Sequence, residues 1–372
     1  MHGNVLLLSQ RRISDLVAFC LAYEFEDTFQ AVTDAERIDA TDLPSLELCR
    51  RSYKLARWAS GSAKLASRLV PSPRSKVVLK QDYELFFPVF SNAFELYSLA
   101  AIPNWRQRCR KAACFITEAW TDELPEYLLE LLSEFDHIFI GLRHCVDEIA
   151  RITGRPCSYL PFAADVLRFA PAPDQPRPIG VCNIGRRSQV THHALLEDTA
   201  QRGGFYYYDT VAASGSDLKQ RTFRVDNAQE HRLMLATILK HSRYFIANRS
   251  HVNNPEFTAG RDEISARFYE GVAAGTVMIG EAPRTEEFRR QFNWNDAVIH
   301  LPFDFPDIGR MLADLNDDPA RLAAVRARNV REAALRHDWV HRIGTVFDVL
   351  RLAPTEKMAA RAAQLGQIAA QA

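Results

Sequence analysis

The alternation of short apolar runs with longer stretches of helical period constrains the fold of this chain most. A short apolar run is typical of a buried strand, whereas apolar residues at every third or fourth position indicate an amphipathic helix. Alternating along a chain, the two patterns predict βα units and a parallel sheet. The alternation occurs on both sides of a proline-rich segment at residues 161–178. The sequence therefore predicts an α/β protein with two doubly wound domains.

The same patterns give the expected elements. In the first half, strands are expected at residues 4–9, 76–79, 113–117 and 137–140, and helices at 13–32, 43–69 and 147–153. In the second half, strands are expected at 179–184, 205–208, 244–247, 276–280 and 297–301, and helices at 191–201, 227–241, 264–274 and over 307–350. Residues 358–372 are rich in Ala and Gln, which predicts either a helix or a frayed tail.

The proline-rich segment predicts where the domains join. It holds five prolines, at positions 161, 171, 173, 176 and 178. Proline removes a backbone donor and disfavours helix in the residue before it, which is typical of a linker. We expect a first domain over 1–170, a second over 171–350, and a C-terminal helix or tail over 351–372. Two such domains place a ligand cleft between the carboxyl ends of their sheets, a layout that several enzyme classes share.

The charge balance limits the partners of the chain. Lys and Arg total 46, Asp and Glu also total 46, and the formal net charge is +0. Coating nucleic acid or an anionic bilayer needs an excess of positive charge, so we expect no nucleic-acid partner. A local basic cluster can still bind a phosphate, and a peripheral membrane contact stays open.

The cysteines and the apolar runs indicate the compartment. The seven cysteines include no Cys-x-x-Cys pair and have no His pair at metal spacing, so reduced thiols and no metal site are expected. No apolar run approaches the ~20 residues that span a bilayer, and the first residues lack the apolar segment of a signal peptide. A cytoplasmic location is expected.

The segment 261–280, RDEISARFYEGVAAGTVMIG, is the most informative for function. A helix that opens with Asp262 and Glu263 presents its positive end to a ligand, which suits a diphosphate. Glu270 would lie ~12 Å further along that helix, where a carboxylate accepts two hydrogen bonds from a ribose diol. Alternatively, the first two acids only complement the helix dipole and Glu270 is a solvated helix residue.

Residues 267–275, RFYEGVAAG, resemble the nucleotide-sugar motif of GT-B-fold glycosyltransferases of group 1, especially the group related to the spore-maturation protein CgeB. Three further stretches are similar to this family in the same order: LPFAADVLRFAP at 160–171, NIGRRS at 183–188 and the helical stretch over 308–350. The resemblance covers about residues 160–350, and residues 1–159 share only the layout. Related retaining enzymes carry two Glu separated by seven residues, whereas here the first position is Asp262 and the second is Glu270.

The resemblance implies a GT-B fold, in which two Rossmann-like domains face each other across a cleft and a last helix packs back on the first domain. It implies transfer of a sugar, hexosyltransferase-like and in carbohydrate metabolism, from a nucleoside-diphosphate sugar to a hydroxyl of a glycan, lipid or small molecule, with retention of configuration. No cofactor and no divalent metal are implied. The residues expected to hold the nucleotide sugar are Gly185, Arg187, Asn248, Arg249, Glu263, Arg267 and Glu270.

Three residues are expected to act on the reacting groups. Arg186, which follows an expected strand, would form charge-assisted bonds to phosphate oxygens, and the helix start near Asp262 would stabilise the leaving diphosphate. Glu118 follows the strand ACFIT and would orient or deprotonate the acceptor hydroxyl, with Trp120 stacking on a sugar. The alternatives are a solvated turn arginine, a helix-terminal acid and a packing indole. The first turn carries Arg11 and Arg12 where many relatives have glycines.

Two other functions remain open from the sequence. One is a binding or scaffold protein that keeps this fold without turnover, and the other is a GT-B-fold sugar-nucleotide epimerase. The sequence does not indicate the donor base, the donor sugar, the acceptor or the oligomeric state.

Overall fold

The computed structural model describes residues 5–11, 16–40, 44–70, 77–120, 126–209, 212–214, 219–221 and 225–372. The chain forms two compact units. Unit 1 comprises Met1–Pro161 and Arg342–Ala360, and unit 2 comprises Phe162–His341 and Arg361–Ala372. The seven cysteines are free thiols, and six of them are buried.

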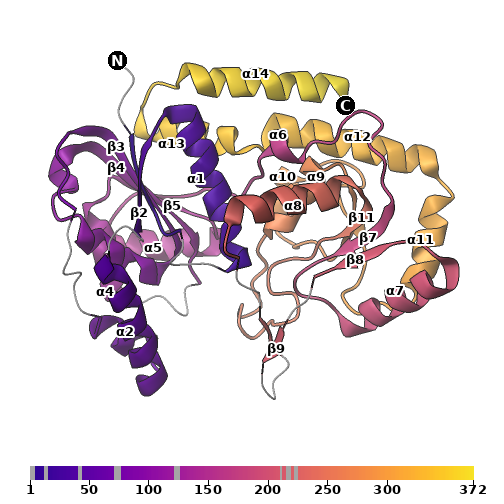
Figure 1. The fold of residues 1–372 in the computed structure, drawn as a ribbon, viewed down its shortest axis with the longest axis horizontal. Helices are drawn as coiled ribbons and strands as arrows, with labels where there is room; N and C mark the ends of the chain where they lie inside the picture. Colours follow the sequence, from indigo (N-terminus) through magenta and orange to yellow (C-terminus); the bar gives the residue numbers. More distant parts are fainter. Residues whose placement is uncertain are drawn as a thin grey trace. The chain divides into compact units, whose positions relative to one another are not determined.

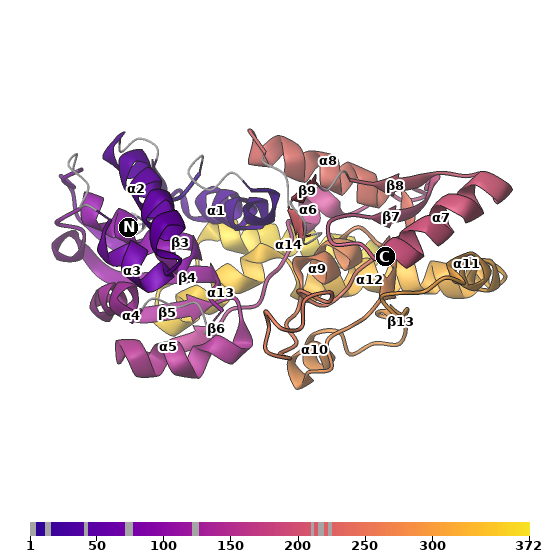
Figure 2. The ribbon, with the colours of Figure 1, turned by 90° about the horizontal axis from the view of Figure 1, so that it is seen from below.

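Unit 1 is built on a six-stranded parallel sheet in the order β2-β1-β3-β4-β5-β6. Figure 2 shows strands β3 to β6 in this order, with α5 beside β6. Every neighbouring pair is parallel, so the carboxyl ends of the strands lie along one edge. The strands are β1 (Val5–Ser9), β2 (Glu36–Asp39), β3 (Tyr83–Asn92), β4 (Cys109–Glu118), β5 (His137–Ile140) and β6 (Cys157–Tyr159).

The helices of unit 1 cover this sheet through an aromatic core. Phe25 and Phe29 of α1 pack against Phe87 of β3, with ring centroids 6.0 and 5.0 Å apart. Phe347 from the later part of α13 lies 6.2 Å from Phe29, so the segment 342–360 completes the core of unit 1. Burying one such ring stabilises the fold by about 1.5–3 kcal/mol. The helices of unit 1 are α1 (Cys20–Thr33), α2 (Pro44–Ser60), α3 (Ala63–Arg68), α4 (Glu126–Leu129) and α5 (Val146–Thr153), and α13 (Trp339–Leu350) and α14 (Glu356–Gln371) contribute residues to both units.

Unit 2 has a five-stranded parallel sheet in the order β13-β12-β11-β7-β8, seen on the right in Figure 1. Side chains of Val181, Tyr244 and Val277 pack on one face with α7, α11 and α12. Gly271 of α9 lies on the other face, against Phe245 and Met278. The strands are β7 (Ile179–Asn183), β8 (Tyr206–Tyr208), β11 (Ser242–Ile246), β12 (Val277–Gly280) and β13 (Ile299–His300).

The helices of unit 2 include most of those that the period of the sequence predicts. They are α6 (Val166–Phe169), α7 (Gln189–Arg202), α8 (Ala228–Lys240), α9 (Ala266–Ala273), α10 (Glu286–Gln291), α11 (Ile308–Asn316) and α12 (Pro319–Arg336). Ser188, Asn227, Thr285 and Asp318 cap α7, α8, α10 and α12 with their side chains. A separate antiparallel pair joins β9 (Ala212–Ser214) and β10 (Lys219–Arg221).

Several predicted elements were wrong. Residues 77–80 form no strand, and the strand of this region is β3, which contains Pro88. Proline inside a run argues against a central strand, although here β3 lies between β1 and β4. Helix α1 begins at Cys20 after a 3-10 turn, and residues 13–15 of its predicted start lie outside the described part of the chain. The edge strands β2 and β6 and the short helix α10 were missed.

Candidate functional site

The sheet of unit 2 has a point where its strand order reverses. The chain passes from β7 to its neighbour β8 on one side and then returns to β11 on the other side. In doubly wound sheets, ligands bind in the crevice that opens at the carboxyl ends of the two strands flanking such a point. The loop at 184–188 follows β7, and the loop at 247–265 follows β11. The candidate site is therefore built from these two loops. Nine of the ten predicted site residues lie in the two loops or in α9, the helix that follows the second loop.

Gly185 and Arg187 shape the first loop. Gly185 has φ 73°, and its backbone N–H donates to both carboxylate oxygens of Asp209, at 2.8 and 2.9 Å. The positive φ favours glycine at this position, and a Cβ here would overlap the Nη2 atom of Arg267. The Arg187 guanidinium donates to the Asp209 carboxylate at 2.6 Å and lies over the Tyr208 ring. These contacts tie Arg187 to the end of β8.

Arg186 lies between the two loops. Its side chain is half-buried, and its Nη1 atom donates to Oδ1 of Asn253, a neutral acceptor, at 3.4 Å. The pKa of His251 is lowered to about 4, mainly by burial and further by the charge of Arg186. The His251 ring stacks on Phe257 at 4.4 Å. The structure thus brings Arg186 to the carboxyl end of β11, and a phosphate beside it would gain a charge-assisted bond.

Asn248 and Arg249 hold the second loop in different ways. Asn248 is buried, and its Oδ1 atom accepts the backbone N–H of Glu281 at 2.8 Å, which joins the ends of β11 and β12. Arg249 forms an ion pair with Asp262 at 3.3 Å, and the side chains of both remain about one fifth exposed, at 19% and 22%. The other oxygen of Asp262 accepts the backbone N–H of Arg284 at 3.0 Å. Asn248 therefore holds the second loop to the end of β12, whereas the side chains of Arg249 and Asp262 stay accessible.

The start of α9 differs from the prediction. The helix begins at Ala266, so Asp262 and Glu263 lie before it and do not form its first turn. Ser265 occupies the N-cap, but its hydroxyl donates to the Asn248 carbonyl at 2.7 Å and does not cap the helix. Without a side-chain cap, the first N–H groups of α9 lack the partner that a Ser at this position usually supplies. Glu263 is buried, and its backbone carbonyl accepts the N–H of Ser250.

Glu270 is neither exposed nor solvated. It is 4% exposed and forms an ion pair with Arg232 of α8, which is 3% exposed and lies over the Phe169 ring. The predicted helical span of ~12 Å from Asp262 to Glu270 was wrong, because the residues before Ala266 are not helical. Arg267 is half-buried beside Gly185, and burial lowers its pKa.

The predicted residues of the first domain lie in unit 1. Glu118 ends β4 and is exposed, in register with Asn92 of β3. Trp120 is 8% exposed and its ring lies 5.1 Å from that of His144, which makes it a packing indole. Arg11 forms ion pairs with Glu26 and Asp27, and Arg12 lies outside the described residues.

The sequence missed four residues of the site in unit 2. Asp209 follows β8 directly, and the rule that singled out Arg186, a polar residue after an expected strand, could have found it. His251 and Asn253 lie in a loop with no pattern that predicts their contacts with Arg186. Arg232 precedes its partner Glu270 by 38 residues, and nothing in the sequence indicates this pair.

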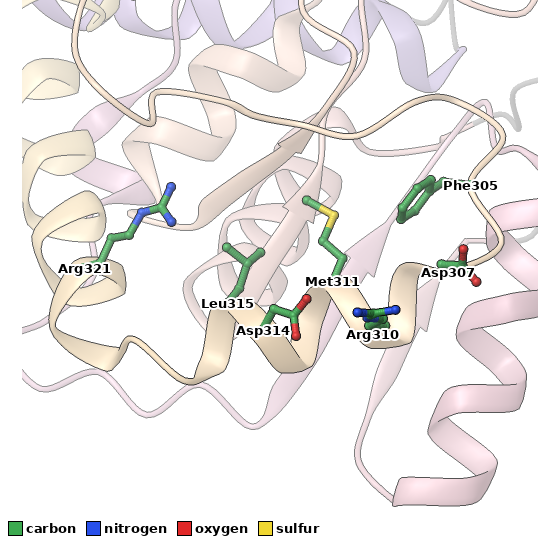
Figure 3. Close-up of a pocket in the computed structure, with 7 residues that line it drawn as sticks. All are labelled: Phe305, Asp307, Arg310, Met311, Asp314, Leu315 and Arg321. Carbon is green, nitrogen blue, oxygen red and sulfur yellow. The ribbon is translucent and has the colours of Figure 1, made fainter.

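A separate hollow of about 440 Å³ lies along α11 (Figure 3). Asp307, Arg310 and Asp314 line it, together with Arg321, which is held by both oxygens of Asp296 at 2.6 and 2.9 Å. Acids and bases alternate here, so the hollow favours no ligand charge. Among the described residues, no group of three His, Cys, Asp or Glu side chains could hold a metal ion. None of the helices that the structure describes is long and apolar enough to cross a membrane.

Comparison with known proteins identifies the fold. Residues 193–348 match the model of a family described as glycosyl transferase-like. No curated protein matches the chain. Among solved structures, Anabaena HepE in complex with UDP is similar, with a TM-score of 0.50, 11% identity, and 94% of this chain and 99% of that chain covered. Sucrose-phosphate synthase from Thermosynechococcus elongatus is similar at a TM-score of 0.50 and 12% identity, over 94% of this chain and 98% of that chain. The chain therefore has the GT-B fold.

Proposed function

We propose that the protein is a glycosyltransferase that moves a sugar from a nucleoside-diphosphate sugar to a hydroxyl acceptor. The family match over residues 193–348 and the fold shared with UDP-bound HepE support this function. The observation that carries the proposal is the position of Arg186. It follows a glycine turn at the point where the strand order of unit 2 reverses, and its Nη1 atom donates to the neutral amide of Asn253.

In the proposed mechanism, the site stabilises the leaving diphosphate electrostatically. Arg186 forms charge-assisted bonds to phosphate oxygens as negative charge develops on them. The N-terminus of α9, which the Ser265 hydroxyl does not cap, adds N–H donors and the positive end of the helix dipole. Arg249 is oriented by Asp262 and supplies a second guanidinium. Arg187 positions the loop through Asp209.

Glu270 has a different part in this proposal from the one that the family resemblance implies. The resemblance puts the ribose on this carboxylate, which here is paired with Arg232 inside unit 2. Removing one partner of a buried ion pair destabilises a protein by about 3–5 kcal/mol. A Glu270→Ala variant would therefore lose activity through unfolding whether or not the residue touches the nucleoside. Arg186 is the better residue for testing the site.

The proposal also takes the finer features that the family resemblance implies. Transfer retains the anomeric configuration, the sugar is a hexose, and the reaction belongs to carbohydrate metabolism in the cytoplasm. No metal takes part, Glu118 acts on the acceptor hydroxyl, and the relationship is to the CgeB group. NMR of the product tests retention, because the coupling constant of the anomeric proton distinguishes the two outcomes.

The test is release of nucleoside diphosphate from a panel of nucleotide sugars. We expect release with at least one donor, and a large loss of release in Arg186→Ala. Arg202→Ala is the matched control, because Arg202 pairs with Asp198 on the exposed side of α7 and lies away from the loop. Equal release by wild type and Arg186→Ala would contradict the site. Nucleotide binding without release indicates a binding protein, and interconversion of the free nucleotide sugar indicates an epimerase.

A further inference from the structure

The outer side of α2 and α3 in unit 1 carries large apolar side chains in solvent. Trp58 is 83% exposed and Leu55 is 65% exposed. Leu48 of the same helix and Leu65 and Leu69 at α3 are also at least half exposed. An exposed group of large apolar residues on a helix marks a surface that another molecule covers. We name these five residues the α2–α3 patch.

The helical geometry places the apolar residues of α2 on one stripe. At about 100° per residue, Leu48 and Leu55 point within ~20° of each other, and Trp58 lies ~60° further round. Cys49 lies ~100° from Leu48 and is buried at 1% exposed, so it marks the side that faces the protein. The helix therefore packs with one side and turns its apolar stripe outward.

The charge of the segment 44–68 differs from that of the whole chain. It contains six Lys or Arg (50, 51, 54, 57, 64 and 68) and one acid, Glu47, a difference of +5 in a chain whose net charge is +0. Arg51 and Lys54 are exposed. At about 100° per residue, Arg51 lies on the apolar stripe itself, ~40° from Leu55 and ~20° from Trp58. Among the described side chains of this segment, exposed positive charge therefore lies on and beside the apolar stripe.

We propose that the α2–α3 patch docks unit 1 onto an anionic lipid surface. A helix with Trp and Leu on one side and flanking Lys and Arg lies in the plane of the membrane interface, where its apolar side chains enter the acyl boundary. Trp prefers this depth, and the basic side chains reach the headgroups. Each Lys or Arg near an anionic leaflet contributes about 1 kcal/mol. The patch thus combines the apolar and the electrostatic contributions that peripheral binding needs.

A protein partner fits this surface less well. The centre of a protein interface is depleted in charged residues. Here Arg51 lies between Leu55 and Trp58 around the helix axis. At a membrane, the same guanidinium keeps contact with phosphate groups and water while its stem lies on the apolar layer. The mixture of charge and apolar area therefore favours lipid over protein.

The experiment is sedimentation of the full chain with lipid vesicles, and it does not depend on the proposed transferase activity. One set contains phosphatidylcholine alone, and the other contains equal parts of phosphatidylcholine and phosphatidylglycerol. We expect binding to the anionic vesicles and at least ten times weaker binding to the neutral ones. In Arg51→Gln/Lys54→Gln, binding to the anionic vesicles should fall by about 10–30-fold, from about 1 kcal/mol per charge.

Leu55→Ser/Trp58→Ser tests the apolar part. We expect the partition coefficient on anionic vesicles to fall at least ten-fold. Phe205→Ser/Leu233→Ser is the matched control, because both residues are exposed apolar side chains of unit 2, at 62% and 58%. An equal loss in this control, or no binding of the wild type to anionic vesicles, overturns the proposal. A dimer of the wild type that Leu55→Ser/Trp58→Ser dissociates would also overturn it, in favour of a second copy as the occupant.

Fluorescence gives a readout that does not depend on the folding of a polar variant. Trp58 is exposed, whereas Trp105, Trp120 and Trp339 are buried. Insertion of Trp58 should shift the emission of the wild type to shorter wavelength with anionic vesicles. Trp58→Phe keeps the apolar ring, so it should still sediment with these vesicles but lose the shift. The same shift in Trp58→Phe and in the wild type overturns the assignment of the patch.

Discussion

The two sheets reverse their strand order in the same way, yet the ends of their strands are filled differently. In unit 1 the reversal falls between β1 and β3, and in unit 2 between β7 and β11. At the end of β1, Ser9 donates to Glu26 at 2.5 Å, and Arg11 pairs with Glu26 and Asp27 at 3.1 and 2.6 Å. At the end of β7, a glycine turn presents Arg186 to a neutral amide.

This difference separates a structural role in unit 1 from the binding role that we propose at the equivalent place in unit 2. In unit 1 the polar groups at the strand ends bind each other, as also seen for Gln10 with Ser98 and for Glu95 with the backbone of Ser91. Glu26 is completely buried there and Arg11 is 13% exposed. An arginine after a first strand is thus not by itself a ligand residue. For Arg11, two acids of unit 1 supply the partners.

The largest effect is expected from Arg11→Ala. Removing this side chain leaves Glu26 buried without its cation, and such losses cost about 3–5 kcal/mol. Urea unfolding at pH 8, where Glu26 is ionised, measures the change in the free energy of unfolding. The double variant Arg11→Met/Glu26→Leu should recover most of the loss, because it replaces the pair by apolar groups. A loss below about 1 kcal/mol in Arg11→Ala would show that this cluster is not structural.

The second prediction concerns the pH dependence of unit 1. Burial raises the pKa of Glu26 to about 7, although Arg11 and Ser9 act against the shift. The folded state then holds a proton that the unfolded state has released, so stability is full at low pH and is lost as pH rises toward 7. Glu26→Gln should remove this decline, on the order of 2 kcal/mol between pH 4.5 and 7.5. Thermal unfolding across this pH range measures the decline in stability. If stability falls with pH as steeply in Glu26→Gln as in the wild type, the prediction is contradicted.

The third prediction is the counterpart of the first in unit 2. Arg186→Ala should change the free energy of unfolding by less than about 0.5 kcal/mol, as expected for a half-buried loop side chain whose Nη1 atom bonds a neutral amide at 3.4 Å. Its affinity for nucleoside diphosphate should fall about 10–100-fold, which corresponds to losing one charge-assisted bond. Calorimetric titration with UDP, GDP and ADP measures this. If Arg186→Ala lowers the free energy of unfolding as much as Arg11→Ala does, the proposed difference between the two strand ends is contradicted.

How far the sequence predicts this molecule depends on how local each feature is. The strands β1, β5, β7 and β12 and most helices of unit 2 follow from apolar period and from caps such as Asn227, which act within one turn. Strand β3 was missed because Pro88 argues against a central strand, and β2 was missed because ERID is a polar edge strand. Their pairing depends on neighbours that are far away in the sequence.

The same distinction applies to the candidate site. Arg186 was predicted from a local rule, the turn after a strand, and Gly185 from the family resemblance. The pairing of Glu270 with Arg232 was not, because it depends on the packing of α8 against α9. Asp262 and Glu263 look like a first helical turn in the sequence, but the helix starts at Ala266. Short polar side chains compete with the helix for backbone groups, so helix starts are hard to place.

The smallest expected effect is also the most specific for the binding role of unit 2. The pKa of His251 is lowered to about 4 by burial and by the charge of Arg186. The folded state therefore disfavours the protonated ring, and its contribution to stability is present above pH 6.5 and lost as pH falls toward 4. A diphosphate bound to Arg186 would place negative charge near this ring. The pKa of His251 should then rise by about half a unit to one unit.

NMR titration of the His251 ring with and without UDP measures this shift. Arg186→Ala should raise the pKa of His251 in the absence of nucleotide, because one of the two causes of its lowering is gone. In that variant, adding UDP should change the pKa of His251 little further. If UDP binds but the pKa of His251 is the same with and without it, the nucleotide lies elsewhere, and the contrast between the two strand ends would not reflect binding. Asn253→Ala is a useful control, because it removes the hydrogen-bond acceptor of Arg186 but leaves its charge.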